Sequence, residues 1–458
     1  MVEFPRMMCT QHPDSTLRVP AHMEIQEALM AFTAYGCDEV MVDYEGKLTP
    51  YSQPREVVAQ ALERGIALGE SRFVTVRLPN PQLESADRLV LALVAALSAN
   101  ALSASRAGTQ AVRWLVLPML SGVDALKEVH QLALKLSGAI GEDGVQAPLL
   151  VPLLESVESL SRVGEYLRVL VSIQGGDGGL RVFLGASDSA VSSGHIASSL
   201  AVRYALGEVS RESDKLGVEA APILGMGRPP FRGGVNEPSL ASREASQYAG
   251  YWTVTVQSAI RYDASSQEYR QFASAVAAQR GAEAESVDAQ ALELVKQAEE
   301  YYRKTLVKVS QAISAVAGNV PQTRDRLVWT EYARRVEVGG AVLKLPRAIP
   351  FTAACYSLGL PPTFLDAPFI LQASGRGLLG KLLELLPNLP LEWGYDSQFL
   401  VSSSVRRFLG GELLEVVRKA MALLGVEERA DPAYAHLVNP DFTELGVLAA
   451  ARWRGFLG

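Results

Sequence analysis

The sequence has little cysteine, and the three cysteines that it has lie far apart. Cys9, Cys37 and Cys355 are too few and too scattered for a disulfide framework or a zinc site. The N-terminus, MVEFPRMM, also lacks the apolar core of a signal sequence. We therefore expect no export and a location in the reducing cytoplasm.

Long apolar runs and blocks of basic residues are missing as well. The most apolar stretch, LVLALVAALSANALSA at 89–104, is short and broken by Ser and Asn, which predicts a buried helix and no membrane span. The net charge is −7 with no Lys/Arg block, which disfavours nucleic acid as the main partner. A local basic pocket for a small anionic substrate remains open.

What the sequence does contain is a β/α alternation over its first 260 residues. Seven β-rich runs, separated by segments that suit amphipathic helices, lie at 38–44, 72–78, 113–120, 149–154, 180–187, 221–227 and 251–258. Apolar strands bracketed by helices predict a parallel sheet covered on both faces. At this number of strands, an α/β fold of the closed (β/α)₈ TIM type is favoured over a doubly wound sheet, with one barrel strand unassigned.

From about residue 265 the pattern changes to long helical stretches with few convincing strands. We therefore predict two regions: a catalytic β/α barrel with an N-terminal active-site segment at 1–262, and a mainly α-helical region at 263–458 that packs on the barrel. With 48% hydrophobic residues in a chain of 458, both regions can bury a core.

Active sites of such barrels lie at the C-terminal ends of the strands, and polar residues of this sequence fall there. Glu155 and Asp188 each directly follow a predicted strand, and Arg77 lies at the end of another. Each carboxylate has an alternative reading as a helix cap. Together, two carboxylates on neighbouring strands suit a hard cation such as Mg²⁺, which takes one or two protein carboxylates plus water and substrate.

The loop GMGRPPFRGG carries two arginines among four glycines. Arg228 and Arg232 suit an anion, and the glycines would let backbone N–H groups approach a phosphate or carboxylate closely. The chain has neither a Walker loop nor a dinucleotide fingerprint behind a strand, which disfavours ATP and NAD.

His12 lies very early in the chain, in TQHPD. One reading is a surface turn, because Pro13 fixes φ and Asp14 and Ser15 can cap a following helix. The other reading is an active-site histidine, and it needs partners elsewhere in the chain.

The chain resembles phosphoenolpyruvate carboxylase, with a length and a TQHPD form similar to the short archaeal type. The resemblance spans nearly the whole chain and rests on six segments in this order: TQHPD, VPLLESVESL, FLGASDSAVSSG, PFRGG, QSAIRYD and LPRAIPFTAACYSLGLPPTFL. It implies that bicarbonate attacks the phosphorus of phosphoenolpyruvate to give carboxyphosphate and an enolate, and that the enolate then captures CO₂ to form oxaloacetate. It also implies assembly as a homotetramer.

The resemblance assigns three residues to metal and proton chemistry. Glu155 and Asp188 would bind Mg²⁺ or Mn²⁺. His12 would lie in the active site, on an N-terminal segment that closes over the barrel rim, and take the proton whose loss releases CO₂.

The same resemblance gives roles to arginines from both regions. Arg232 would handle the reacting carboxyl group, and Arg347 and Arg334 would contact the substrate phosphate. Arg335 is an alternative to Arg334, because the spacing of EYARRVEVGGAVLKLPR allows either. Two further arginines would bind substrate, Arg77 and Arg228.

Two other functions stay open beside this one. An isocitrate-lyase-like C–C lyase would share the Mg²⁺ and enolate chemistry, but it would need a reactive acid such as cysteine in a barrel loop. Cys37 precedes its strand and Cys355 lies outside the barrel, which disfavours that lyase. A non-catalytic anion sensor is the second, and its best support is Val191, because the larger bacterial and plant carboxylases have lysine after the SDSA segment.

Overall fold

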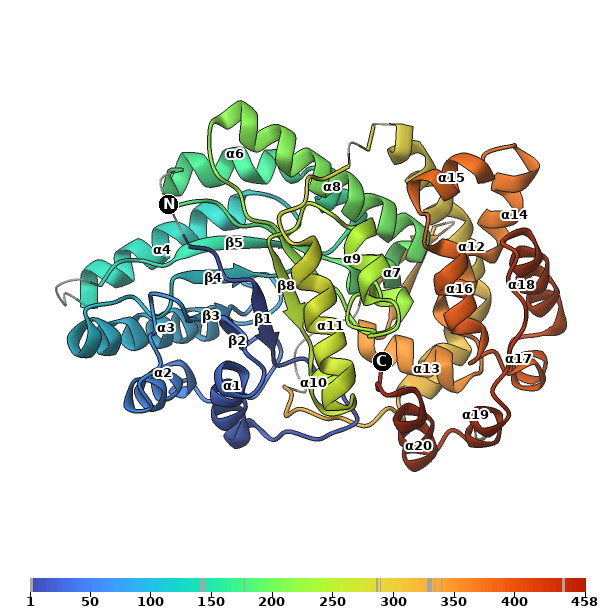
Figure 1. Ribbon diagram of the computed structural model, residues 1–458, viewed down its shortest axis with the longest axis horizontal. Helices are drawn as coiled ribbons and strands as arrows, with labels where there is room; N and C mark the ends of the chain where they lie inside the picture. Colours follow the sequence, from blue (N-terminus) through green and yellow to red (C-terminus); the bar gives the residue numbers. More distant parts are fainter. Residues whose placement is uncertain are drawn as a thin grey trace.

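Eight parallel strands form a closed barrel in the computed structural model, which describes residues 3–140, 145–176, 178–285, 287–288, 290–327, 332, 334–338, 340–438 and 441–458. Each strand pairs with its neighbours in sequence, and the last pairs with the first. The predicted TIM-type fold is therefore confirmed (Figure 1). The strands are β1 Met7–Thr10, β2 Glu39–Asp43, β3 Phe73–Arg77, β4 Trp114–Leu117, β5 Leu149–Leu154, β6 Phe183–Gly185, β7 Ile223–Gly225 and β8 Thr253–Val256.

All seven predicted strands are present, and the unassigned strand is β1. It was missed because it is only four residues long, MMCT, and has a single β-branched residue, Thr10. His12 therefore lies just beyond the C-terminal end of a barrel strand. The N-terminal segment thus contains a barrel strand, and its closure over the rim stays a prediction.

Helices cover the outside of the barrel between successive strands. They are α1 Glu24–Thr33, α2 Gln53–Glu63, α3 Ala86–Ala107, α4 Asp124–Ile140, α5 Val157–Ser161, α6 Val163–Gln174, α7 Ala186–Ser193, α8 His195–Leu216, α9 Ala241–Gln247, α10 Ser258–Tyr262 and α11 Ser266–Gln279, with short 3₁₀ turns η1 Ala21–Met23 and η2 Pro230–Arg232. Helix α3 is long and apolar enough to cross a membrane, yet 67% of its most apolar window is buried in the protein. The predicted buried helix is thus confirmed.

The N-terminal end of the barrel interior is filled by apolar side chains and one ion pair. Phe73 and Trp114 pack there edge to face, with ring centroids 5.0 Å apart. Arg181 donates from both Nη atoms to the Glu39 carboxylate at 2.8 Å, and both side chains are fully buried. Since this end is filled, the C-terminal ends of the strands are left for a site.

The second half of the chain is a helical region with its own apolar cluster, which includes Phe364 and Trp393. Its elements are α12 Gln290–Ala317, α13 Ala348–Ser357, η3 Pro362–Asp366, α14 Ala367–Gly375, α15 Leu379–Leu385, α16 Leu389–Ser397, α17 Ser402–Phe408, α18 Gly411–Leu423, α19 Pro432–Leu437 and α20 Glu444–Arg454. Helix α11 follows the predicted boundary at 262, yet its Phe272 and Val276 belong to the barrel's cluster. The helical region lies at the rim end of the barrel (Figure 1).

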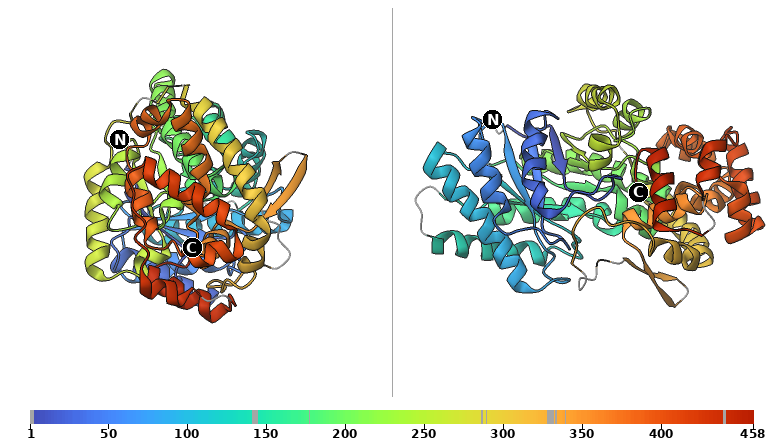
Figure 2. Two further views of the ribbon diagram at one scale, coloured as in Figure 1. Left: turned by 90° about the vertical axis from the view of Figure 1, so that its right-hand side faces the viewer. Right: turned by 90° about the horizontal axis from the view of Figure 1, so that it is seen from below.

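An antiparallel hairpin interrupts the helical region and was not predicted. It consists of β9 Arg334–Val338 and β10 Ala341–Leu345. Figure 2 shows it projecting from the body of the protein, with its base near the barrel. Its alternating sequence, RRVEV, gave a strand signal that the surrounding helical patterns masked.

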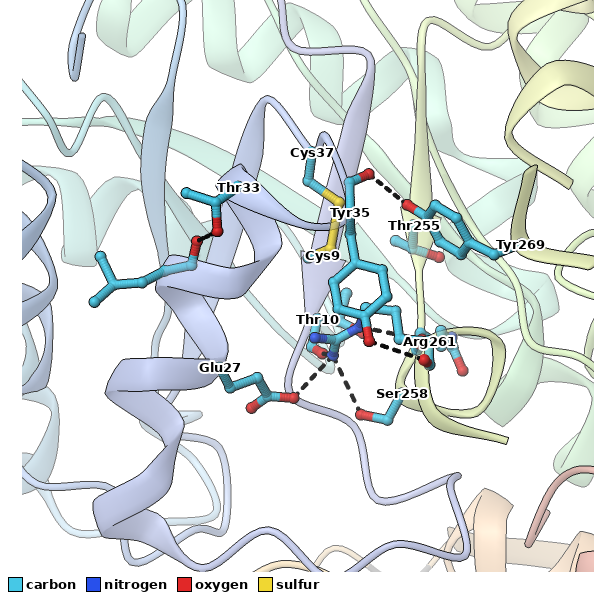
Figure 3. Close-up of a disulfide and its surroundings, with 12 residues drawn as sticks. Cys9, Thr10, Glu27, Thr33, Tyr35, Cys37, Thr255, Ser258, Arg261 and Tyr269 are labelled. Atoms are coloured by element: carbon cyan, nitrogen blue, oxygen red, sulfur yellow. Dashed lines mark hydrogen bonds and ion pairs between the residues drawn. A yellow bond between two sulfur atoms is a disulfide. The ribbon is translucent and has the colours of Figure 1, made fainter. Parts of the chain in front are cut away.

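A disulfide joins Cys9 in β1 to Cys37, just before β2 (Figure 3). This crosslink differs from the expectation drawn from the number and scattering of the cysteines, because residues far apart in sequence are neighbours on adjacent barrel strands. Cys355 is free and buried. The cysteine content therefore gives no argument for a reducing compartment.

We expect Cys37→Ser to lower the free energy of unfolding by about 3 kcal/mol, because the crosslink spans a separation of 28 residues and restricts the unfolded chain. Thermal unfolding with and without reductant measures this. Reductant should lower the midpoint of the wild-type protein and leave that of the variant unchanged. An equal response of both proteins would contradict a native crosslink.

Candidate active site

A cavity opens at the C-terminal ends of the barrel strands, beneath the start of α13. It brings together six predicted site residues: His12, Arg77, Glu155, Asp188, Arg232 and Arg347. These residues come from the ends of three strands, from α7, from η2 and from the residue before α13. The rim that the sequence predicted is therefore the rim that holds the cavity.

The surroundings of His12 in this cavity favour the neutral imidazole. Burial and the nearby Arg77 charge lower its pKa well below the ordinary value, with further lowering by Arg232 and Lys47, while Asp43 opposes the shift. Its Nδ1 shares a hydrogen bond with Thr10 Oγ1 at 3.1 Å. A neutral ring held by one nitrogen has its other nitrogen available for proton transfer.

Glu155 and Asp188 lie against one guanidinium group. Arg334 Nη2 is 3.4 Å from Asp188 Oδ2 and 4.0 Å from Glu155 Oε2. Burial and the neighbouring Asp188 charge raise the pKa of Glu155 to about 8. Burial also acts to raise the pKa of Asp188, but Arg334 and Arg347 outweigh it, so that this pKa is lowered.

This pair of carboxylates fits a hard divalent cation. Glu155 and Asp188 converge on a point where a cation, the guanidinium of Arg334, already lies. Within the described part of the chain, no three or more His, Cys, Asp or Glu side chains are grouped as a metal site. Mg²⁺ does not require such a group, because water and substrate complete its coordination.

The alternative reading of the two carboxylates as helix caps is wrong. Ser156 is the N-cap of α5 and forms a capping box with Ser159. Gly185 is the N-cap of α7, and Asp188 lies within the first turn of that helix. The carboxylates are therefore not needed as helix caps.

Alternation along β9 separates the two arginines that the spacing left open. Arg334 is partly buried and contacts the carboxylates, whereas Arg335 lies on the exposed side of the strand. Successive side chains of a strand point to opposite faces, so only one of them can face the barrel. The geometry favours Arg334.

Glu45 links two arginines of the cavity. Arg77 donates to both oxygens of Asp43, at 2.8 and 2.7 Å, and its Nη1 is 2.5 Å from Glu45 Oε2. Arg347 donates from Nη2 to Glu45 Oε1 at 3.0 Å. These contacts fix Arg77 on the barrel wall beside Arg347 from the helical region.

Arg326 is a further cavity residue, and sequence reasoning missed it. Burial and the nearby Arg347 charge lower its pKa to about 9, with a further contribution from Arg77, although Asp43 and Glu45 oppose the shift. Burial therefore leaves the positive charge of Arg326 incompletely compensated. An anion in the cavity would stabilise that charge.

Arg232 is held in place from several sides. Its Nε donates to Ser187 Oγ at 2.9 Å and its Nη2 to Gln257 Oε1 at 2.7 Å, while Nη1 donates to the main-chain oxygen of Gly458 and lies 3.7 Å from Asp14 Oδ2. Burial lowers its pKa, although Asp14 and Asp188 oppose the shift. The side chain is pre-positioned and faces the cavity.

Three of the four glycines of the GMGRPPFRGG loop do not offer N–H groups to an anion as expected. The N–H of Gly227 donates to the carbonyl of Arg232 at 2.7 Å, and those of Gly233 and Gly234 donate to proline carbonyls in the same loop. A Cβ at Gly227 would lie 2.8 Å from the guanidinium carbon of Arg232. The loop thus needs glycine there so that Arg232 can pack over its backbone.

Arg228 and Val191 do not line the cavity. Arg228 donates to Glu237 Oε2 at 2.8 Å and to the carbonyl of Gly455 at 2.7 Å. Val191 is fully buried in the apolar cluster of the helical region. The structure therefore gives Arg228 the position of a residue that ties the loop to the C-terminal helix.

Besides Arg326, four polar residues of the site were missed. Asp43 ends β2, and Gln257 directly follows β8, so the rule that found Glu155 would have found them too. Ser187 lies in the first turn of α7 beside the predicted Asp188, and Glu45 lies in the loop after β2. Arg326 had no such signal, because it follows a long helix in an irregular segment.

Known proteins match the chain over its full length. The sequence model of the family described as phosphoenolpyruvate carboxylase matches residues 4–458. A phosphoenolpyruvate carboxylase of Thermofilum pendens is 48% identical, with 100% of both chains covered. Those of Pyrobaculum islandicum and Methanosarcina barkeri are 43% and 30% identical, covering 99% and 97% of this chain and 100% and 93% of theirs.

Arg326→Lys should affect anion binding, whereas Arg228→Lys should affect thermal stability. Lysine keeps the charge but loses the planar fork of donors. We expect Arg326→Lys to weaken the binding of inorganic phosphate about tenfold, measured by calorimetry. Arg228→Lys should leave phosphate affinity unchanged and lower the midpoint of thermal unfolding, because its bonds to Glu237 and Gly455 are broken.

If only Arg228→Lys reduced the affinity for phosphate, Arg228 would be an anion-binding residue, as the sequence predicted. It would also show that Arg326 lines the cavity without contacting the anion.

Proposed function

The chain belongs to the phosphoenolpyruvate carboxylase family, and from this premise we propose which of its residues form oxaloacetate and phosphate from phosphoenolpyruvate and bicarbonate. The observation that carries the proposal is one cavity at the barrel rim that collects a neutral histidine, two carboxylates and four arginines. The reaction needs an anion site, a divalent cation and a proton acceptor. The arginines supply the anion site, the two carboxylates supply ligands for the cation, and the histidine supplies the proton acceptor.

Glu155 and Asp188 would hold Mg²⁺ or Mn²⁺. When bound, the ion supplies electrostatic stabilisation of the negative charge on the phosphate and enolate oxygens. Arg334 lies against the same two carboxylates, so a cation is stabilising at this position. The elevated pKa of Glu155 supports this assignment, because it marks a position where an added cation is stabilising.

Arg77, Arg326 and Arg347 form the anion site for the phosphoryl group of phosphoenolpyruvate. All three line the cavity, and Glu45 and Asp43 fix Arg77 and Arg347 from behind. Guanidinium groups match phosphate oxygens with paired donors, so this cluster stabilises the charge that spreads over the transferring group. Bicarbonate then attacks phosphorus, which gives carboxyphosphate and the enolate of pyruvate.

Arg232 also lines this cavity, and we assign it the binding of the reacting carboxyl group. Its guanidinium is anchored by Ser187 and Gln257, so little reorganisation is needed when an anion arrives. The charge stabilises carboxyphosphate while its carboxyl group is released as CO₂ beside the enolate.

His12 takes the proton of the carboxyl group. Its lowered pKa keeps the ring neutral at physiological pH, so a lone pair is available. In the tautomer in which Nδ1 holds the proton and donates to Thr10 Oγ1, Nε2 is the acceptor. Loss of the proton lets carboxyphosphate release CO₂, which the enolate carbon attacks to form oxaloacetate.

The positions of the cysteines further disfavour a C–C lyase of the isocitrate-lyase kind. Cys9 and Cys37 form a disulfide, and Cys355 is buried away from the cavity. Assembly as a homotetramer and a cytoplasmic location stay predictions.

We expect Asp188→Asn and Glu155→Gln each to weaken Mn²⁺ binding at least about tenfold, because each removes a ligand charge while preserving side-chain shape. Titration followed by electron paramagnetic resonance measures the affinity without turnover. Glu237→Gln is the matched control, since that carboxylate pairs with Arg228 outside the cavity. Wild-type affinity in both site variants would contradict the metal assignment.

His12→Asn should separate the two halves of the reaction. The variant retains the arginines and carboxylates for phosphoryl transfer but has no base near neutral pH. We expect bicarbonate-dependent release of phosphate and pyruvate from phosphoenolpyruvate, with little oxaloacetate. Phosphate, pyruvate and oxaloacetate are measured in parallel, with and without bicarbonate.

The wild-type protein in the same assay tests the function itself, because its oxaloacetate must depend on both phosphoenolpyruvate and bicarbonate. An anion sensor would form no product. A wild-type ratio of oxaloacetate to phosphate in His12→Asn would show that His12 is not the proton acceptor.

A further inference from the structure

A set of buried hydrogen bonds holds the backbone on both sides of His12. The carbonyl groups concerned belong to residues that flank His12 in the segment 10–14, and each accepts from a different part of the chain. The pairs are Arg261 with Thr10, Lys47 with Gln11, and Thr323 with Pro13. Helix α10, the loop after β2 and the loop after α12 thus all donate hydrogen bonds to the same short segment.

Arg261, on α10, makes the central contact (Figure 3). Its Nη2 donates to the carbonyl of Thr10, to Glu27 Oε1 at 2.9 Å and to Ser258 Oγ at 3.3 Å. The side chain is 1% exposed. Thr10 in turn bonds through Oγ1 to Nδ1 of His12, so one residue separates the guanidinium from the imidazole.

Glu27 and Arg324 hold Arg261 in that orientation. Arg324 donates from both Nη atoms to the Glu27 carboxylate at 2.6 Å and from Nη2 to Ser258 Oγ at 2.8 Å. These contacts lower the pKa of Glu27 to about 2: burial opposes the shift, but the charges of Arg324 and Arg261 outweigh it. Glu27 therefore stays ionised between two guanidinium groups.

Lys47 makes the second contact of the same kind. Its Nζ donates to the carbonyl of Gln11 at 3.4 Å and to Glu24 Oε1 at 2.6 Å, and Arg324 Nη1 also donates to Glu24 Oε1 at 3.1 Å. The lysine side chain is 2% exposed. We call Glu24, Glu27, Lys47, Arg261 and Arg324 the buried ion cluster.

The stability of the fold does not by itself explain the buried ion cluster. Taking five charged groups out of water is costly, and well-packed apolar side chains of similar volume commonly do as well or better. What apolar side chains cannot do is donate to backbone carbonyls. The buried ion cluster directs two of its cations at the carbonyls immediately before His12, which is the arrangement that fixing a catalytic ring requires.

We infer that Arg261 and Lys47 are positioning residues for His12, acting through the carbonyls of Thr10 and Gln11, and that Glu27 and Arg324 fix Arg261 for this task. The inference rests on the proposed role of His12 as proton acceptor. It assigns the loop after α12 a part in aligning a residue on β1, far away in sequence.

The ratio of oxaloacetate to phosphate tests the inference in the full-length enzyme. Arg261→Lys keeps a cation beside Glu27, but one ammonium group cannot reproduce the fork that reaches Thr10, Glu27 and Ser258 together. We expect the ratio to fall about tenfold, because a displaced imidazole accepts the proton poorly while phosphoryl transfer continues. Lys47→Met should lower the ratio as well and serves if Arg261→Lys does not fold.

Tyr262→Phe is the matched control. The Tyr262 hydroxyl bonds Glu27 Oε1 at 2.9 Å and accepts from Arg261, yet it makes no hydrogen bond to the segment that carries His12. Its variant should keep the wild-type ratio. A merely structural role would reduce the amount of active enzyme and lower both products equally, which leaves the ratio unchanged.

A wild-type ratio in both Arg261→Lys and Lys47→Met, beside a low ratio in His12→Asn, would overturn the inference and leave the proposed function standing. A wild-type ratio in His12→Asn would overturn the role of His12 and the inference with it. Bicarbonate-dependent oxaloacetate formation by the wild type reports on the proposed function separately.

Discussion

The pairing of buried charges at the barrel rim is the constraint on which the site depends. Charged groups away from water are costly unless opposite charges and hydrogen bonds compensate them. On the barrel side of the cavity, the carboxylates of Asp43, Glu45, Glu155 and Asp188 outnumber the guanidinium groups of Arg77 and Arg232. Without the helical region, the barrel would therefore have excess negative charge at its rim. Glu155 and Asp188 already disfavour each other's ionisation there.

The helical region corrects this balance, which explains why it closes over the rim. Arg334 from the hairpin lies against Glu155 and Asp188, and Arg347 before α13 lies against Glu45. With Arg326 added, four guanidinium groups and two carboxylates line the completed cavity, which therefore favours an anion. A divalent cation at Glu155 and Asp188 would compete with Arg334 for the same two carboxylates.

The sequence predicted what depends on local order and missed what depends on contacts between distant segments. Glu155, Asp188 and Arg77 were predicted because polar residues at the ends of apolar strands meet on one rim in a β/α barrel. Strand β1 was too short for a periodic signal, although the motif after it was recognised. The partners of Arg228 and the Cys9–Cys37 crosslink depend on which segments become neighbours in space, which neither composition nor spacing records.

The positive potential that binds the anion also sets the protonation state of His12. Arg77 and Arg232 lower the pKa of the ring, in addition to burial, and both line the cavity that receives substrate. An anion bound between them offsets part of their charge, and the pKa of His12 must then rise. In the proposed mechanism, the ring would thus become a stronger base when carboxyphosphate is bound, at the step in which His12 accepts the proton.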